Sequence, residues 1–127
     1  MTKIYLACPY SHDDPKVREE RFKMVNCMAG ILMQEGNVVF SPISHTHPIA
    51  EARCLPKGWE FWRGQDLPFI EWCDELHVLM LEGWTESVGV QAEINMAENT
   101  GKFVAFIIPA YQIRELVRES EDDSNTP

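Results

Sequence analysis

The segment from Lys3 to Cys8 reads KIYLAC and is followed directly by Pro9. It is apolar almost throughout and contains β-branched and aromatic residues, a composition typical of a strand buried on both faces of a sheet. Three more runs of this character follow along the chain, at Asn37–Phe40 (NVVF), Glu75–Leu81 (ELHVLML) and Phe103–Ile108 (FVAFII). Because strands buried on both faces are characteristic of parallel sheets, the sequence predicts a mostly parallel sheet with these four strands.

Helical patterns separate the predicted strands. Asp14 and Pro15 supply an N-cap and a proline at the first helical position, and apolar residues then recur at helical spacing as far as Gly36. Ser87–Gly101 shows the same spacing and ends at a glycine suited to a helix C-terminus. A final amphipathic helix is predicted at Tyr111–Glu119.

Two regions rich in proline are harder to interpret. Trp59–Cys73 has helical spacing, but Pro68 requires either a kink or a start near Asp66. Ile43–Gly58 is interrupted by two prolines and predicts a long loop with at most one short helix.

Strands that alternate with helices indicate an α/β fold, and right-handed crossovers favour a three-layer sandwich around a doubly wound, flavodoxin- or Rossmann-like sheet. We expect one domain over residues 1–119 and a disordered acidic tail over residues 120–127. In such sheets the ligand crevice lies beyond the carboxyl ends of the strands, so the loops at that edge are the place to look for function.

Composition excludes several classes of function. The 127 residues are 45% hydrophobic and carry a formal net charge of −9, so the basic footprint of a duplex-nucleic-acid binder is missing. The longest apolar run, Phe103–Tyr111, is too short to cross a bilayer, and no secretory leader is evident at the N-terminus. The four cysteines form no C-x-x-C pair and are expected to be reduced core thiols, which favours a cytoplasmic location.

Residues that could contact a ligand lie at the predicted carboxyl edge, most of them in loops and Glu93 one to two turns into the following helix. They are Pro9, Tyr10, Ser11 and His12 after the first strand, Ser41, Ser44, His45, Thr46 and His47 after the second, and Glu82, Trp84, Glu86, Ser87 and Glu93 after the third. Glu93 stands out because Val90, Ile94 and Ala97 place it on or near the buried face of its helix. A carboxylate in that position is either paired or poised for chemistry.

Four segments resemble the nucleoside 2-deoxyribosyltransferase superfamily, which includes deoxynucleoside-monophosphate N-glycosidases. They are Ile4–Tyr10 (IYLACPY), Gly36–Pro42 (GNVVFSP), Asp66–Asp74 (DLPFIEWCD) and Ser87–Ala97 (SVGVQAEINMA) with Gly101-Lys102 beyond it. Together they span about residues 3 to 107 in the family's order. The resemblance implies an enzyme that cleaves or transfers at the N-glycosidic bond of a nucleoside or nucleoside 5′-monophosphate, without a cofactor. It also implies a homo-oligomer, in which an aromatic patch around Trp59–Trp62 would be covered.

The resemblance assigns three catalytic roles. Glu93 matches the nucleophile that forms a covalent glycosyl-enzyme, although a helix glutamate can also be paired to a basic neighbour. Asp66 matches the acidic residue that protonates the departing base, although it could instead be a helix N-cap. Tyr5 matches a tyrosine that orients the nucleophile, or it is simply a core residue with a satisfied hydroxyl. Asp74 matches a structural aspartate between helix and strand.

The remaining candidates would bind the substrate. Ser87 lies where a helix N-terminus favours an anion such as a 5′-phosphate, while the adjacent Glu86 disfavours one. Gly89 and Asn95 belong to the same motif. Pro9, Ser11, His12, His45 and His47 come from the loops, with Arg18 as a further phosphate candidate. His45 and His47 fit no standard zinc spacing with Cys54, so no metal is expected.

Two departures from the family pattern bear on activity. Cys8 stands where many members have glycine, and Asn95 replaces a glycine after the Glu93-Ile94 pair. Both were expected at pocket positions, so an alternative function remains open: a nucleotide- or nucleotide-sugar-binding sensor that keeps the fold without turnover.

Overall fold

A computed structural model describes residues 1–56 and 58–109 of the chain. Its sheet contains β1 (Lys3–Ala7), β2 (Val38–Phe40), β3 (Glu75–Leu79) and β4 (Phe103–Ile107), in the order β2-β1-β3-β4, with every neighbouring pair parallel. The predicted α/β sandwich with a doubly wound parallel sheet is therefore confirmed. The chain moves outward from β1 to β2 and then returns to the other side of β1 at β3, so the topological switch point lies between β1 and β3.

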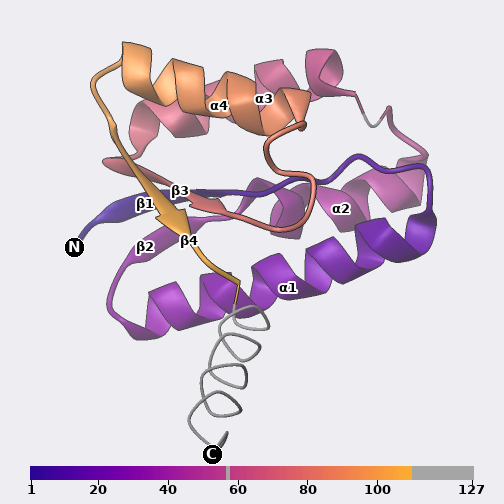
Figure 1. The fold of residues 1–127 in the computed structure, drawn as a ribbon, viewed down its shortest axis with the longest axis horizontal. Coiled ribbons are helices and arrows are strands. Elements are labelled where there is room, and N and C mark those ends of the chain that lie inside the picture. Colours follow the sequence, from indigo (N-terminus) through magenta and orange to yellow (C-terminus); the bar gives the residue numbers. More distant parts are fainter. Residues whose placement is uncertain (57, 110–127) are drawn as a thin grey trace, which may run out of the picture.

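Helices cover the two faces of the sheet (Figure 1). Helices α1 (Pro15–Gln34) and α2 (Pro42–Arg53) lie on one side, and α3 (Trp59–Trp72) and α4 (Val88–Asn99) lie on the other. Side chains alternate along β1, so Ile4 and Leu6 join the core under α1 while Tyr5 and Ala7 join the core under α3 and α4. This alternation decides which face each residue of the site serves.

The first helix begins and ends as its sequence predicts. The Asp14 side chain accepts a hydrogen bond from the backbone N–H of Lys16, and Pro15 occupies the first turn. Gly36 lies just beyond the C-terminus with a φ of 96°, the left-handed conformation that glycine adopts without strain.

Over residues 43–58, where the sequence predicts a long loop with at most one short helix, the structure has the 12-residue helix α2 (Pro42–Arg53), so most of the expected loop is helical. Pro42 stands in the first turn, where its missing N–H has no intrahelical partner to lose. Pro48 removes one hydrogen bond inside the helix, but burial of Ile43, His47 and Ala50 offsets that loss. Tertiary packing here overrides a local helix-breaking signal.

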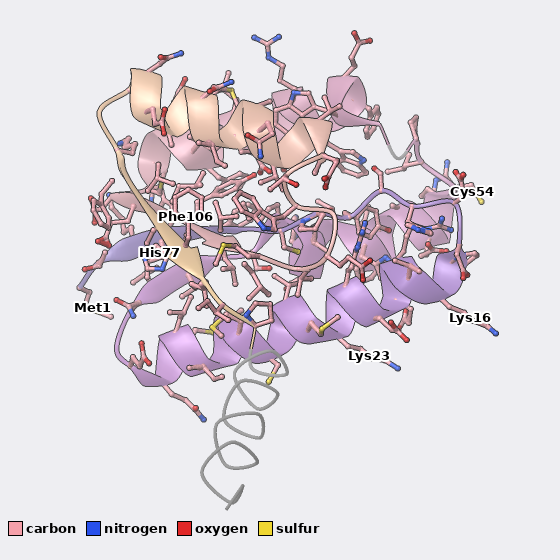
Figure 2. All side chains as sticks on the ribbon, in the orientation of Figure 1. Met1, Lys16, Lys23, Cys54, His77 and Phe106 are labelled. Carbon is pink, nitrogen blue, oxygen red and sulfur yellow. The ribbon has the colours of Figure 1, made fainter. Side chains whose placement is uncertain are left out.

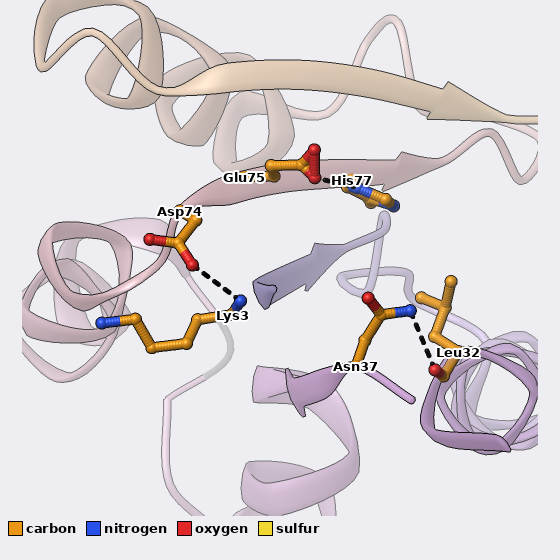
Figure 3. A network of polar contacts seen from close by, with 6 residues as sticks. All are labelled: Lys3, Leu32, Asn37, Asp74, Glu75 and His77. Atoms are coloured by element: carbon orange, nitrogen blue, oxygen red, sulfur yellow. Dashed lines mark hydrogen bonds and ion pairs between the residues drawn. The ribbon is translucent and has the colours of Figure 1, made fainter. Parts of the chain in front are cut away.

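Helix α3 begins at Trp59 and continues through Pro68, so the alternative start near Asp66 is wrong. Asp66 lies inside the helix and is not its N-cap. The chain then passes Asp74, which ties the start of β3 to β1 (Figure 3): its Oδ2 accepts from the Lys3 N–H at 2.9 Å, and its own N–H donates to the Lys3 carbonyl at 2.8 Å. The structural role expected for Asp74 matches this contact.

Helix α4 follows the loop after β3, with Ser87 as its N-cap. Val90, Glu93, Ile94 and Ala97 are its buried residues, as the apolar spacing predicts. Within the described residues no helix is long and apolar enough to span a bilayer. The predicted helix at 111–119 and the predicted tail at 120–127 lie outside the described residues.

Candidate active site

A cleft of about 870 Å³ opens at the carboxyl edge of the sheet. It lies beyond the switch point, where doubly wound sheets bind ligands. Its lining comes from the loop after β1, helix α1, the first turns of α2, helix α3 with the residue before it, the loop after β3 and the first turns of α4. These residues are Cys8–Ser11, Arg21, Pro42, Ile43, Thr46, Gly58–Glu60, Trp62, Arg63, Asp66, Gly83, Glu86–Gly89 and Glu93.

Three predicted catalytic residues meet beside this cleft. Glu93 of α4 is 5% exposed and Asp66 of α3 is 7% exposed, and both contribute to the lining. Tyr5 of β1 is fully buried beneath them on the same face of the sheet, and its hydroxyl donates a hydrogen bond to Oε2 of Glu93. The Tyr5 side chain also lies close enough to Asp66 to lower the pKa of that carboxyl group. Residues from three distant parts of the sequence thus form one cluster. Glu93 and Asp66 are called the acid pair below.

Burial governs the protonation of this cluster. Loss of solvent raises the pKa of Glu93 to about 8, with the Tyr5 hydrogen bond acting against the shift and the charge of Asp66 adding to it. Burial likewise raises the pKa of Asp66 to about 6. The pKa of Tyr5 is raised well above its usual value by burial and by Glu93, so its hydroxyl keeps its proton. Near neutral pH the acid pair therefore holds about one proton between two carboxyl groups.

Arg21 and Arg63 are charged cleft residues that the sequence analysis missed, and Arg21 is the buried one. Its guanidinium is buried and donates to the carbonyl of Ser11 at 3.1 Å and to the carbonyl of Glu82 at 3.0 Å. No carboxylate among residues 1–56 and 58–109 lies within ion-pair distance of it. A signal was present: Arg21 shares a helical stripe with Val25, Ala29 and Leu32, all of them buried.

Ser87 and Gly89 lie in the cleft at the start of α4. The Ser87 hydroxyl accepts from the N–H of Val90 at 3.2 Å, so the N-cap role is present. Gly89 faces Trp59 of α3, which would lie 3.5 Å from a Cβ at that position. Glu86 also lines this part of the cleft.

The first loop divides its residues between two hollows. Pro9, Tyr10 and Ser11 line the cleft, whereas His12 lines a smaller hollow of about 330 Å³ that shares Ser11 with it. His12 Nδ1 accepts from the N–H of Asp14 at 3.0 Å. Arg18, the other phosphate candidate, donates to the His12 carbonyl and lines the smaller hollow.

Besides His12, three predicted substrate-binding residues lie apart from the cleft lining. His45 is exposed on α2, and Asn95 is exposed on α4, facing away from the side of the helix that carries Glu93. His47 is buried between α1 and α2, where both ring nitrogens have partners. A substrate-binding position is thus not supported by the placement of these three side chains.

Metal-ligating residues are dispersed in the structure. Cys54 caps the far end of α2 at the periphery of the molecule (Figure 2) and is exposed. In the described part of the chain no three His, Cys, Asp or Glu side chains are grouped closely enough to hold a metal ion.

Cys8, which the sequence resemblance predicts at a pocket position, does lie in the cleft lining. It is buried at the end of β1, lines the cleft and lies within electrostatic range of both Glu93 and Arg21. Burial raises the pKa of its thiol, so the sulfur remains protonated and acts as a small apolar surface.

These observations define the class of protein. It is a small α/β sandwich with a cleft at its topological switch point, and two buried acidic residues line that cleft. The chain belongs to the family described as a domain of unknown function, DUF1937, which matches residues 2–108. That match covers all four strands and every residue of the cleft. No curated protein matches the sequence.

Proposed function

We propose that this protein cleaves or transfers at the N-glycosidic bond of a nucleoside or nucleoside 5′-monophosphate through a covalent glycosyl-Glu93 intermediate. The observation that carries the proposal is the acid pair: both carboxyl groups are buried and line the cleft, and Glu93 accepts a hydrogen bond from the Tyr5 hydroxyl. Two buried carboxyl groups with separated pKa values are the usual equipment for one nucleophile and one acid. The sequence resemblance to nucleoside 2-deoxyribosyltransferases assigns the same two residues to these roles.

The chemistry proceeds in two displacements. The Glu93 carboxylate attacks the anomeric carbon of the sugar, the bond between that carbon and the base nitrogen breaks, and Asp66 donates a proton to the departing base. Water, or a second base, then attacks the same carbon and releases Glu93, while Asp66 takes back a proton from the attacking group. Each step forms one bond to carbon and breaks one.

Proton placement explains why Tyr5 lies between the two acids. The two pKa values place the proton on Glu93, whose pKa is about 8, and leave Asp66 ionised, since its pKa is about 6. The reaction needs the reverse arrangement, with Glu93 ionised and Asp66 protonated. Moving the proton across two pKa units costs about 3 kcal/mol, a small part of an enzymatic rate enhancement. Tyr5 donates to Glu93 and lies close enough to Asp66 to influence its pKa, so its hydroxyl is placed to assist this transfer.

The electrostatics of the cleft favour an anionic substituent on the substrate. Arg21 brings a buried positive charge whose neighbours within hydrogen-bonding distance are carbonyl oxygens. Ser87 adds a hydroxyl and the N-terminus of α4. Glu86 and Glu60 oppose them at the rim. We therefore favour a nucleoside 5′-monophosphate, bound with its phosphate toward Arg21 and Ser87.

The direct test is release of free base from a panel of nucleosides, deoxynucleosides and their 5′-monophosphates, with and without an acceptor base. We expect release or exchange with at least one member, and kcat/KM that rises and then falls with pH, with limbs near 6 and 8. Ser87→Ala should lower kcat/KM about tenfold for the monophosphate and leave the free nucleoside unchanged. Binding without any release would select the alternative of a non-catalytic sensor, and neither binding nor release would refute both.

Self-association is the second part of the proposal. The sequence resemblance implies at least a dimer, and Phe61 between the two cleft tryptophans is 41% exposed on α3. Light scattering at micromolar concentration should give at least twice the mass of one chain. A monomeric mass would refute this part alone.

A further inference from the structure

A second chain of polar contacts ends at the cleft. The Tyr10 hydroxyl lies 2.5 Å from Nδ1 of His47, and Nε2 of His47 lies 3.0 Å from Oε2 of Glu19. Tyr10 comes from the loop after β1, His47 from α2 and Glu19 from α1. These three residues are called the relay below, and Tyr10 is the one that lines the cleft.

The direction of each hydrogen bond follows from the groups involved. An ionised carboxylate only accepts, so Nε2–H of His47 donates to Glu19. In the tautomer that carries its single N–H on Nε2, Nδ1 accepts and the Tyr10 hydroxyl donates to it. Burial raises the pKa of Tyr10, with Glu51 and Glu19 adding to the shift and Arg18 opposing it, so the hydroxyl retains the proton that it donates.

Packing fixes the relay in place. His47 is 7% exposed, whereas the Glu19 side chain is 48% exposed. The imidazole packs against Phe22 of α1 with ring centroids 4.5 Å apart, and it meets the Tyr10 ring edge-on at 5.4 Å. An apolar side chain would fill this space at lower desolvation cost, so the core alone does not require a histidine here.

We propose that Glu19 and His47 are positioning residues for Tyr10, and that the Tyr10 ring forms a fixed wall of the cleft that contacts a ring of the bound nucleoside. Anchoring the hydroxyl at one end stops the side chain from rotating, so the ring meets the ligand without an ordering cost. Ile43 and Thr46 of the same helix α2 line the cleft beside Tyr10, so the relay also fixes the position of their wall. The class of ligand rests on the proposed function, but the relay itself does not.

Fluorescence titration tests the assignment, because Trp59 and Trp62 line the same cleft. The probes are the four deoxynucleoside 5′-monophosphates, titrated into wild type, Tyr10→Phe, Glu19→Gln and the double variant. We expect Tyr10→Phe to weaken binding of the preferred probe about fivefold and Glu19→Gln about threefold. The double variant should bind no more weakly than Tyr10→Phe alone, because Glu19 acts through the hydroxyl. Glu20→Gln, which removes an exposed neighbouring charge of α1, is the matched control and should bind as wild type.

Turnover on the same preparations separates this assignment from the proposed function. A positioning role predicts a higher KM with kcat unchanged, which a general loss of stability would not produce. Additive effects in the double variant, wild-type affinity in Tyr10→Phe, or no probe binding by wild type would overturn the assignment. Tyr10-dependent binding without base release would leave the assignment standing and overturn the proposed function.

Discussion

Two tyrosines serve this cleft, and their surroundings differ in one decisive respect. Tyr5 lies wholly inside the protein between two acids that share a proton. Tyr10 is only partly buried and bonds a histidine whose other partner, Glu19, is half exposed to water. The first arrangement has no solvated group to stabilise its charge, so the pKa values of its acids rise. The second leads its charge to the surface. We therefore assign Glu93 and Asp66, which are buried without a countercharge, to the chemistry. We assign His47 and Glu19, whose carboxylate reaches water, to holding the Tyr10 side chain in place.

The largest expected contrast is between the two glutamates. Glu93→Gln should lower base release at least about a thousandfold, because an amide cannot form the glycosyl ester. Glu19→Gln should change kcat less than about twofold, because it acts on Tyr10 alone. The measurement is single-turnover base release with each variant. A comparable loss of kcat in both would remove the distinction between the two tyrosine clusters.

Stability should depend on pH through the acid pair. The folded pKa of Glu93, about 8, lies above its ordinary value of 4.5, and that of Asp66, about 6, lies above 3.8. The folded state therefore binds more protons than the unfolded state over this interval, and the free energy of unfolding should fall as pH rises from about 4 to about 8. Glu93→Gln should remove most of the decline above pH 6, of the order of 3 kcal/mol. Urea unfolding across this range provides the measurement, with Glu20→Gln, a change at an exposed glutamate of α1, as the control that should keep the wild-type slope.

Asp66 should matter in proportion to how poor the leaving group is. Asp66→Asn should lower base release from an ordinary nucleoside about a hundredfold, because an unprotonated base is a poor leaving group. With an activated substrate, such as a 4-nitrophenyl deoxyriboside, the loss should shrink to less than about tenfold. Rate constants for both substrates are compared in wild type and variant. Equal losses for the two would mean that Asp66 does not protonate the leaving group.

The smallest expected difference separates the two hydroxyl groups. Tyr5→Phe removes the hydrogen bond that lowers the pKa of Glu93, so the limb of the pH profile assigned to Glu93 should move to higher pH and kcat should fall about tenfold. Tyr10→Phe should leave both limbs in place. The profile of kcat/KM against pH for the two variants tests this, and an unshifted limb in Tyr5→Phe would exclude the role of Tyr5 in tuning Glu93.

Regular spacing explains why α4 and Glu93 were predictable. The helix after β3 has an unbroken apolar stripe, and a carboxylate within such a stripe is visible without any knowledge of its neighbours. Arg21 could have been found by the same argument, since it begins the buried stripe of α1. Its hydrogen-bond acceptors could not, because they are backbone carbonyls and any residue supplies one.

Helix α2 marks where local patterns fail. Pro48 indicates a break, and only contacts with α1 and β1 offset it. The relay of Tyr10, His47 and Glu19 depends on how α1 and α2 pack, so no spacing along the sequence could predict it. His47 was identified as a ligand-binding candidate from its loop-like context, and its burial between helices changes that interpretation.

The guanidinium of Arg21 joins the loop after β1 to the loop after β3. These loops lie on either side of the topological switch point, where the order of the strands reverses. β1 ends at Ala7 and β3 ends at Leu79, so backbone pairing no longer holds the chain together beyond these residues. The Arg21 side chain of α1 connects the two loops there instead. Arg21 therefore links the two loops at the mouth of the cleft, and they cannot separate without breaking one of these two hydrogen bonds. Adding a side chain at Gly83, whose Cβ would lie 3.1 Å from that guanidinium and whose φ is 93°, would strain this link from the opposite side.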